Sequence, residues 1–306
     1  MYKTEDFFAC PICKSKLADF SCESCKICFP KKAVPSFICR EMYPSEQSYE
    51  DAMRVIDFWG NGWKKRLKES EHEFIYDLDT KELEAYADHS LAWCHSNKSL
   101  MGLEAPTQKI SGLSVLNIGC GAGTEAVILA RAGALCLAMD ITEPAANATD
   151  LLLRKMGGGF GMQGDARFIP LQSESVDIVY SSGVLHHSSD IPKSISEIHR
   201  VLKPGGVAYI MLYATWSITF LQEKFWHRAG EVAWNTEGRK NPCTTTYSVH
   251  ECKNLFSEFE IISISKRNAS LKNLYKIGRY MPTCFDKYLD GLGANLNIVV
   301  KKSNNS

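Results

Sequence analysis

Short apolar runs alternate with longer amphipathic segments through most of the chain. The run at 115–118 ends in the glycine-rich segment 119–124 and opens onto a helical pattern that reaches Gly133. Further strand-like runs lie at 134–139, 176–180, 207–213, 259–266 and 295–301. Apolar runs of about four to eight residues that alternate with helical patterns are typical of a parallel sheet in an α/β fold. We therefore expect an α/β domain over residues 107–302.

The segment from 42 to 106 has helical periodicity. One apolar face contains Met53, Ile56, Gly60, Trp63 and Leu67, and it is interrupted at Gly60 to Gly62. A second face contains Leu83, Tyr86, Ala87, Leu91 and Cys94. Core packing explains both faces, although the aromatic run from Phe58 to Trp63 could also cap a flat ligand. We expect this segment to be a helical cap or linker.

The glycine-rich segment is the first candidate for chemistry. Glycines permit positive φ and close approach of a ligand, and the following helix N-terminus offers free N–H groups to a nucleotide-like molecule. Asp140 ends the second apolar run, where its carboxylate can accept both hydroxyl hydrogens of a ribose. The spacing from Gly119 to Asp140 also suits a nicotinamide or flavin cofactor, and the turn alone could be purely structural.

Cysteines gather at the N-terminus. The pairs Cys10/Cys13 and Cys22/Cys25 each have Cys-x-x-Cys spacing, and together they can supply four thiolates to a tetrahedral structural zinc ion. Cys28 forms a third such spacing with Cys25, so it is an alternative ligand. Four coincidental core cysteines are the competing interpretation, but so small a segment has little core without a metal.

Composition narrows the function classes. The 306 residues carry a formal net charge of zero, which argues against a strongly basic nucleic-acid surface. No apolar run approaches the roughly 18 residues needed to span a bilayer, and the first residues lack a secretory pattern. We expect a cytoplasmic protein with reduced cysteines and no membrane association.

Several segments between Val115 and Tyr213 resemble one family. The segment 164–170 reads Gly-Asp-Ala-x-x-x-Pro, and 202–206 reads Leu-x-Pro-Gly-Gly, which looks like a helix stop and tight turn before a strand. With the glycine turn, they resemble class I S-adenosylmethionine-dependent methyltransferases of the methyltransferase type 11-like group. This implies a Rossmann-like seven-stranded sheet with helices on both faces and a last antiparallel strand. Residues 1–41 resemble small zinc ribbons that accompany some methyltransferases.

The resemblance also implies a cofactor site. It assigns S-adenosylmethionine contacts to Asn117, Gly119, Cys120, Gly121, Gly123, Asp140, Ile141, Asp165, Ala166 and Ser182. Asp140 would hold the ribose, Ile141 would pack on adenine, and Asp165 would accept from the adenine amino group. The family usually has an acidic residue where this chain has Asn117, so the asparagine keeps hydrogen bonding but loses charge.

The reaction implied is methyl transfer to an oxygen or nitrogen atom of a small molecule or biosynthetic intermediate. His187 and His186 follow the fourth strand, where an imidazole could act as general base, or could simply pack against the sheet. An insertion at about 214–258 is expected to shape the acceptor pocket. The alternatives are an RNA base methyltransferase that recognises RNA through its ribbon, and a noncatalytic scaffold whose ribbon recruits a protein partner.

Overall fold

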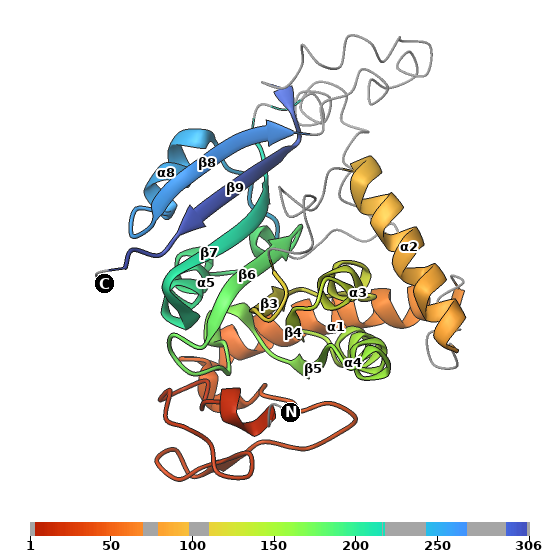
Figure 1. Cartoon of the computed structure of the whole chain (residues 1–306). Coiled ribbons are helices and arrows are strands. Elements are labelled where there is room, and N and C mark those ends of the chain that lie inside the picture. Colours follow the sequence, from red (N-terminus) through yellow and green to blue (C-terminus); the bar gives the residue numbers. More distant parts are fainter. Residues whose placement is uncertain are drawn as a thin grey trace.

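The computed structural model describes residues 4–69, 79–97, 110–215, 217, 243–267 and 292–304 (Figure 1). Within these ranges, no helix combines the length and apolarity needed to cross a membrane. The predicted insertion at 214–258 lies partly outside the described residues, since 216 and 218–242 are not among them.

A seven-stranded sheet forms the centre of the molecule. Its strands are β3 (Ser114–Ile118), β4 (Leu135–Asp140), β5 (Gly159–Gln163), β6 (Val176–Ser182), β7 (Leu202–Tyr213), β8 (Glu260–Arg267) and β9 (Asn295–Lys301). The order is β5-β4-β3-β6-β7-β9-β8, in which β3 to β7 pair in parallel and β9 is antiparallel to both neighbours. The predicted sheet with its antiparallel last strand is confirmed.

Helices cover both faces of this sheet, as expected. Successive residues of a strand point to opposite faces. Val115 therefore packs with α3 (Thr124–Arg131) and α4 (Glu143–Met156), whereas Leu116 packs in the cluster that contains α5 (Ile191–Val201) and Cys252 of α8 (Val249–Leu255). Figure 1 shows these helices around the strands.

The segment 202–206 differs from its prediction. We expected a tight turn before a strand that begins at Val207, but β7 already begins at Leu202. Gly205 has φ +77°, and the pairing of β6 with β7 is irregular between Val176 and Ile178. The glycines therefore produce a kink at the start of the strand instead of a separate turn.

Two helices precede the sheet. α1 (Glu46–Glu69) runs without a break across Gly60 and Gly62, so these residues interrupt its apolar face but not the helix. Each glycine costs about 1 kcal/mol in a helix, but tertiary packing can offset this cost. α2 (Thr80–Asn97) buries the expected apolar face against α3 and α4, and the buried members of that face are Leu83, Tyr86, Ala87 and Cys94.

The N-terminal residues form a small separate layer below β5 in Figure 1. It contains η1 (Thr4–Phe7), the two-stranded sheet of β1 (Ser21–Cys22) and β2 (Ile27–Cys28), and η2 (Arg40–Met42). Its phenylalanines belong to the same hydrophobic cluster as Phe160 and Met162 of β5. The layer therefore shares a core with the large sheet.

Candidate functional site

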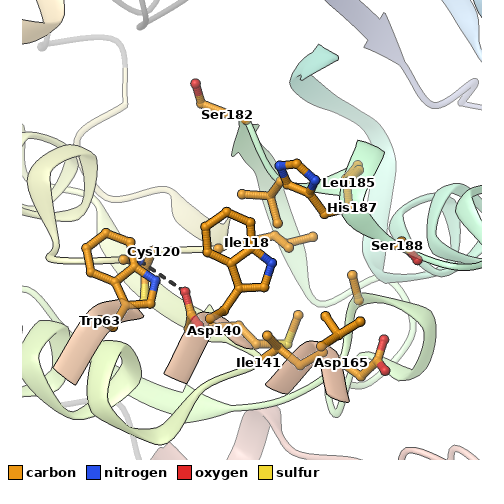
Figure 2. A pocket seen from close by; sticks show the side chains of 18 of the residues that line it. Trp63, Ile118, Cys120, Asp140, Ile141, Asp165, Ser182, Leu185, His187 and Ser188 are labelled. Atoms are coloured by element: carbon orange, nitrogen blue, oxygen red, sulfur yellow. Dashed lines mark hydrogen bonds between the residues drawn. The ribbon is translucent and has the colours of Figure 1, made fainter. Parts of the chain in front are cut away.

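A cavity of about 940 Å³ opens at the carboxyl ends of β3, β4 and β6 (Figure 2). Most predicted site residues line it: Gly119, Cys120, Gly121, Asp140, Ile141, Asp165, Ala166, Ser182 and His187. Asn117, Gly123 and His186 are not among the lining residues. Ligands of open α/β sheets bind at this end of the strands, and pockets of this size accept drug-sized molecules.

The glycine turn connects β3 to α3, and its glycines have the positive φ angles that the sequence predicted. Gly119 has φ +71° and Gly121 has φ +54°. A Cβ at Gly119 would lie 2.1 Å from Val184, and one at Gly121 would lie 2.7 Å from the Trp63 ring. These two glycines are therefore required by neighbouring protein side chains as well as by the left-handed backbone conformation.

Asp140 is a buried carboxylate with a fixed orientation. One oxygen accepts from the Gly121 N–H at 3.1 Å, and the other accepts from the N–H and hydroxyl of Thr142 at 2.9 and 2.8 Å. Burial raises the pKa of Asp140, while these donors favour the ionised form. The side chain is thus anchored on the glycine turn and lines the cavity, as a ribose-binding group requires.

Asp165 has more protein partners than the sequence suggested. Its oxygens accept from the backbone N–H of Arg167 at 2.9 Å, from the Arg167 guanidinium at 2.6 to 3.1 Å, and from the Tyr43 hydroxyl at 3.2 Å. A carboxylate has about four lone-pair directions. An adenine amino group would therefore join or replace an existing donor, and the adenine role of Asp165 stays a prediction.

Asn117 provides a test of whether the family's cofactor fits this chain. It is 2% exposed, and its Oδ1 accepts no hydrogen bond within the described part of the chain. A buried acceptor costs free energy unless a donor reaches it. Asn117 does not line the cavity, so its Oδ1 can reach the ammonium group of S-adenosylmethionine only through a bridging donor such as water. Asp140, whose carboxylate lines the cavity, is the acceptor that suits the ribose hydroxyls of S-adenosylmethionine.

The two histidines lie in different environments. His187 lines the cavity, and its Nδ1 lies 3.0 Å from the Cys243 carbonyl oxygen. Since a carbonyl only accepts, Nδ1 carries the proton and Nε2 carries the lone pair. Burial lowers the pKa of His187 to about 4, so the ring is neutral at pH 7.

His186 is fully buried and stacks on the Tyr213 ring at a centroid distance of 3.6 Å. Neither ring nitrogen has a hydrogen-bond partner among the described residues. Burial, with His187 adding to it, holds the pKa of His186 well below its usual range. The environment is that of a packed core ring, and its catalytic role stays a prediction.

Helices α1 and α2 supply the wall that faces the sheet. Val55, Trp59 and Trp63 follow one another at intervals of four residues on α1, and all three line the cavity. From α2 come Tyr86 and Trp93. The sequence offered the aromatic run as a cap but favoured core packing, and the predicted apolar face contained Trp63 without Val55 or Trp59. The four-residue spacing of these three side chains is the signal that could have grouped them.

Trp59 and Trp63 have distinct neighbours. The Trp59 ring lies 5.1 Å from the His187 ring, whereas Trp63 rests on Gly121 and has the Arg66 guanidinium 5.1 Å above its ring. Figure 2 shows Trp63 near Cys120 and Asp140. The helical wall therefore touches both the glycine turn and the candidate base.

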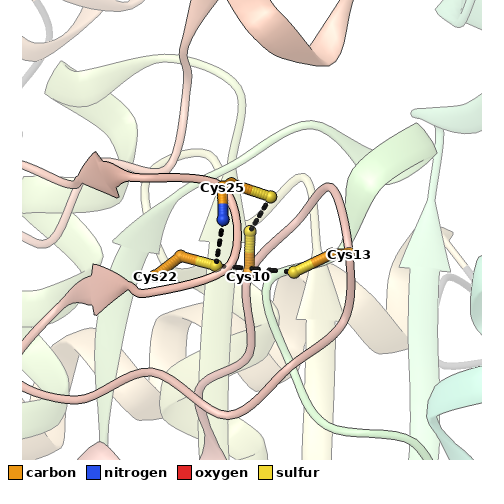
Figure 3. Close-up of side chains that lie close together, drawn as sticks. All are labelled: Cys10, Cys13, Cys22 and Cys25. Carbon is orange, nitrogen blue, oxygen red and sulfur yellow. Dashed lines mark hydrogen bonds between the residues drawn. The ribbon is translucent and has the colours of Figure 1, made fainter.

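The four predicted metal ligands converge in the N-terminal layer (Figure 3). The sulfurs of Cys10, Cys13, Cys22 and Cys25 all lie within 4.8 Å of one another. The sulfur–sulfur distance is 3.9 Å for Cys10/Cys25 and 3.4 Å for Cys13/Cys22. A tetrahedron with Zn–S bonds of about 2.3 Å separates its sulfurs by about 3.8 Å. The set therefore fits zinc, and Cys28 lies outside it.

Comparisons with known proteins cover the central part of the chain. Residues 116–210 match the family model described as a methyltransferase domain. Malonyl-[acyl-carrier protein] O-methyltransferase of Serratia marcescens is 31% identical over 112 residues, which are 37% of this chain and 42% of the relative. Ubiquinone biosynthesis O-methyltransferase of Sinorhizobium fredii is 30% identical over 108 residues, 34% of this chain and 42% of the relative. The chain thus spans less than half the length of these relatives.

Among solved structures, a chain in the complex of the Haloferax volcanii Trm112 methyltransferase activator with a methyltransferase has the same fold. The TM-score is 0.50 at 17% sequence identity, and the match covers 72% of this chain and 98% of that chain. The family match, the sheet order and the glycine turn together show that this chain carries a class I S-adenosylmethionine-dependent methyltransferase domain.

Proposed function

We propose that this protein transfers a methyl group from S-adenosylmethionine to an oxygen or nitrogen atom of a small-molecule acceptor. One observation carries the proposal: a single cavity is lined by most of the predicted cofactor residues, Asp140 among them, and by the candidate base His187. When bound, the cofactor supplies an electrophilic methyl group on sulfur. The protein then has to align the acceptor, exclude water and remove a proton where the acceptor carries one.

The tautomer of His187 suits a role in removing a proton from the acceptor. The Cys243 carbonyl keeps the proton on Nδ1, so Nε2 is the nitrogen that can accept a proton from a hydroxyl or amine. Trp59 packs against the same ring and restricts its orientation. Aromatic side chains at this end of the cavity favour a compact acceptor with apolar surface.

A small molecule is favoured over RNA by the partners of the basic residues. Lys31 pairs with Asp19, Lys32 pairs with Glu143, and Arg66 stacks on Trp63 inside the cavity. Basic groups with such partners contribute little to a phosphate-binding surface. Two similar proteins are O-methyltransferases, one named for malonyl-[acyl-carrier protein] and one for ubiquinone biosynthesis, and both names agree with an oxygen atom as acceptor.

Calorimetry with S-adenosylhomocysteine tests the cofactor half of the proposal. We expect binding by the purified protein and a loss of about 30- to 150-fold in the Asp140→Ala variant, because hydrogen bonds to a charged group contribute about 2 to 3 kcal/mol. Asp177→Ala is the matched control, since this carboxylate binds Ser114 and Lys203 at the opposite end of the strands. Absence of binding by the wild type would refute the proposal.

We also propose that the four cysteines hold a structural zinc ion. A closed set of four thiolates leaves no open position for substrate, so the metal would stabilise the N-terminal layer. Cys10→Ser should release most of the metal measured by atomic absorption, whereas Cys28→Ser should retain one equivalent per chain. Equal metal content in the two variants would contradict the assignment.

A further inference from the structure

Ion pairs of Lys14 with Glu197 and of Lys32 with Glu143 join the N-terminal layer to α5 and α4. Its backbone also pairs with the methyltransferase domain at two places, and these places enclose a cavity-lining segment. At the first, Pro35 to Phe37 pairs in parallel with the edge strand β5: the Phe37 N–H donates to the Gln163 carbonyl at 3.0 Å, and the Gln163 N–H donates to the Pro35 carbonyl at 2.9 Å. At the second, the Ala9 N–H donates to the Pro170 carbonyl at 3.1 Å. Asp165 and Ala166 lie between the two attachments.

Two buried side-chain connections then lead from this layer to the cavity. The Ser36 hydroxyl donates to the Gln163 side-chain oxygen at 2.7 Å, and the Gln163 amide donates to the Ile141 carbonyl at 3.1 Å. The Tyr43 hydroxyl donates to Asp165 at 3.2 Å. Ile141 and Asp165 both line the cavity, on the side where the adenine is expected.

The cysteine cluster belongs to the same packed unit. Cys10 and Cys22 are buried in the hydrophobic cluster that includes Phe37 and Phe160 of β5. Phe8 joins the two parts, with ring centroids 4.9 Å from Phe37 and 5.6 Å from Phe160. Order imposed on the cysteines is therefore transmitted to β5 through packed rings, because packed interiors are stiff.

Protection of an edge strand is the simpler explanation for such a layer. It explains the backbone pairing between Ser36 and Gln163. It does not explain why buried polar connections continue from Ser36 and Tyr43 to residues of the cavity, since an apolar contact would cover the edge without the cost of burying polar groups.

We propose that the N-terminal layer is part of the cofactor site, in which Ser36 and Tyr43 are positioning residues for the adenine side through Ile141 and Asp165. This proposal rests on the proposed function and on the zinc site. A layer ordered by its metal preorganises the adenine side, so metal and cofactor each increase the affinity for the other.

The first experiment uses reciprocity in the zinc-loaded full chain. Zinc release to a colorimetric chelator is followed with and without saturating S-adenosylhomocysteine. We expect the ligand to slow zinc release, and metal removal to weaken ligand binding, each by at least about fivefold. The same weakening should occur with 5′-methylthioadenosine, which keeps the adenine and ribose but lacks the amino-acid end. An unchanged release rate in protein that binds S-adenosylhomocysteine would overturn the proposal.

The second experiment separates positioning from metal-dependent stability. The double variant Ser36→Ala/Tyr43→Phe keeps the rings and the backbone pairing, so we expect full zinc content with about fivefold weaker binding of both ligands. Tyr49→Phe is the control, because its ring lies 5.7 Å from the Tyr43 ring but outside both connections. Wild-type affinity in a zinc-loaded double variant would refute the proposal. Failure of the wild type to bind either ligand would instead refute the proposed function.

Discussion

The two sides of the cavity come from different parts of the chain and are positioned by different forces. On the sheet side, backbone pairing fixes the strand ends from which the lining loops start: Asp140 pairs in register with Gln163, and Ile118 pairs with Met139. On the helical side, Trp59 and Trp63 of α1 are held only by tertiary packing. The polar groups expected to bind the cofactor lie on the sheet side, and the aromatic surface that we propose limits the acceptor lies mainly on the helical side.

This difference limits what can be inferred about the cavity from similar proteins. The family match covers residues 116–210, which include the sheet side but neither α1 nor α2. The family therefore implies the cofactor, whereas the wall that we propose selects the acceptor lies outside the match. The following predictions separate the contributions of the two sides.

His187 is the point where both sides meet, and its replacement should have the largest effect. General-base catalysis contributes about 10²- to 10⁴-fold, so His187→Gln should reduce kcat/KM by that amount with an acceptor identified through formation of S-adenosylhomocysteine. Only the neutral ring accepts a proton. Because burial lowers the pKa of His187 to about 4, wild-type kcat/KM should fall only as the pH decreases through about 4.

Two controls accompany this prediction. His199→Gln changes a histidine that packs against Phe259 away from the cavity, and it should leave kcat/KM near the wild-type value. NMR titration of the His187 ring measures its pKa directly. If His187→Gln retains most of the wild-type rate, the ring only contributes to packing and the base role is wrong.

The contact between Trp63 and Gly121 should have the next largest effect, on stability. An alanine at Gly121 would adopt a left-handed conformation and place its Cβ 2.7 Å from the Trp63 ring, so Gly121→Ala should reduce the free energy of unfolding by roughly 2 to 3 kcal/mol. Gly112→Ala is the matched control: its φ is +79°, but its Cβ would meet no atom within 4 Å.

A double-mutant cycle isolates the contact. Trp63→Leu should recover about 1 kcal/mol of the loss in Gly121→Ala and nothing in Gly112→Ala, as measured by urea unfolding. Equal losses in the two glycine variants would show that backbone conformation alone requires glycine at position 121. The helical side would then not constrain the turn.

The difference between local signals and tertiary packing also explains which features the sequence could predict. Apolar runs and turn residues are local signals, so the bounds of β9, the position of Asp140 and the cysteine cluster agree with their predictions. The contact between Tyr43 and Asp165 joins residues 122 positions apart, and nothing local encodes it. Helical periodicity likewise indicated an apolar face on α1 without showing that Trp59 faces a cavity.

Tertiary packing overrides local preferences at some positions. α1 continues through Gly60, which is buried near the N-cap residue of α4: a Cβ there would lie 3.9 Å from the Thr142 methyl group. β7 begins at Leu202, before its glycines, because β6 provides a partner strand from Val176 onward. Glycine and proline mark breaks only where no such partner is available.

Replacement of His186 should have the smallest effect of these substitutions. It tests whether a side chain on the sheet side that does not line the cavity still contributes to the cofactor site. Its ring is buried without hydrogen-bond partners among the described residues, so His186→Leu should change S-adenosylhomocysteine affinity less than about twofold and leave stability at pH 7.5 nearly unchanged or slightly higher.

The folded protein holds the pKa of His186 well below its usual range, whereas the unfolded chain takes up a proton near pH 6.5. Wild-type stability therefore decreases as the pH falls below about 6.5, by up to about 1.4 kcal/mol per pH unit from this group. Thermal unfolding at pH 5 and pH 7.5 should show a larger gain for His186→Leu at pH 5. A large loss of cofactor affinity in a stable His186→Leu protein would instead place this histidine in the site.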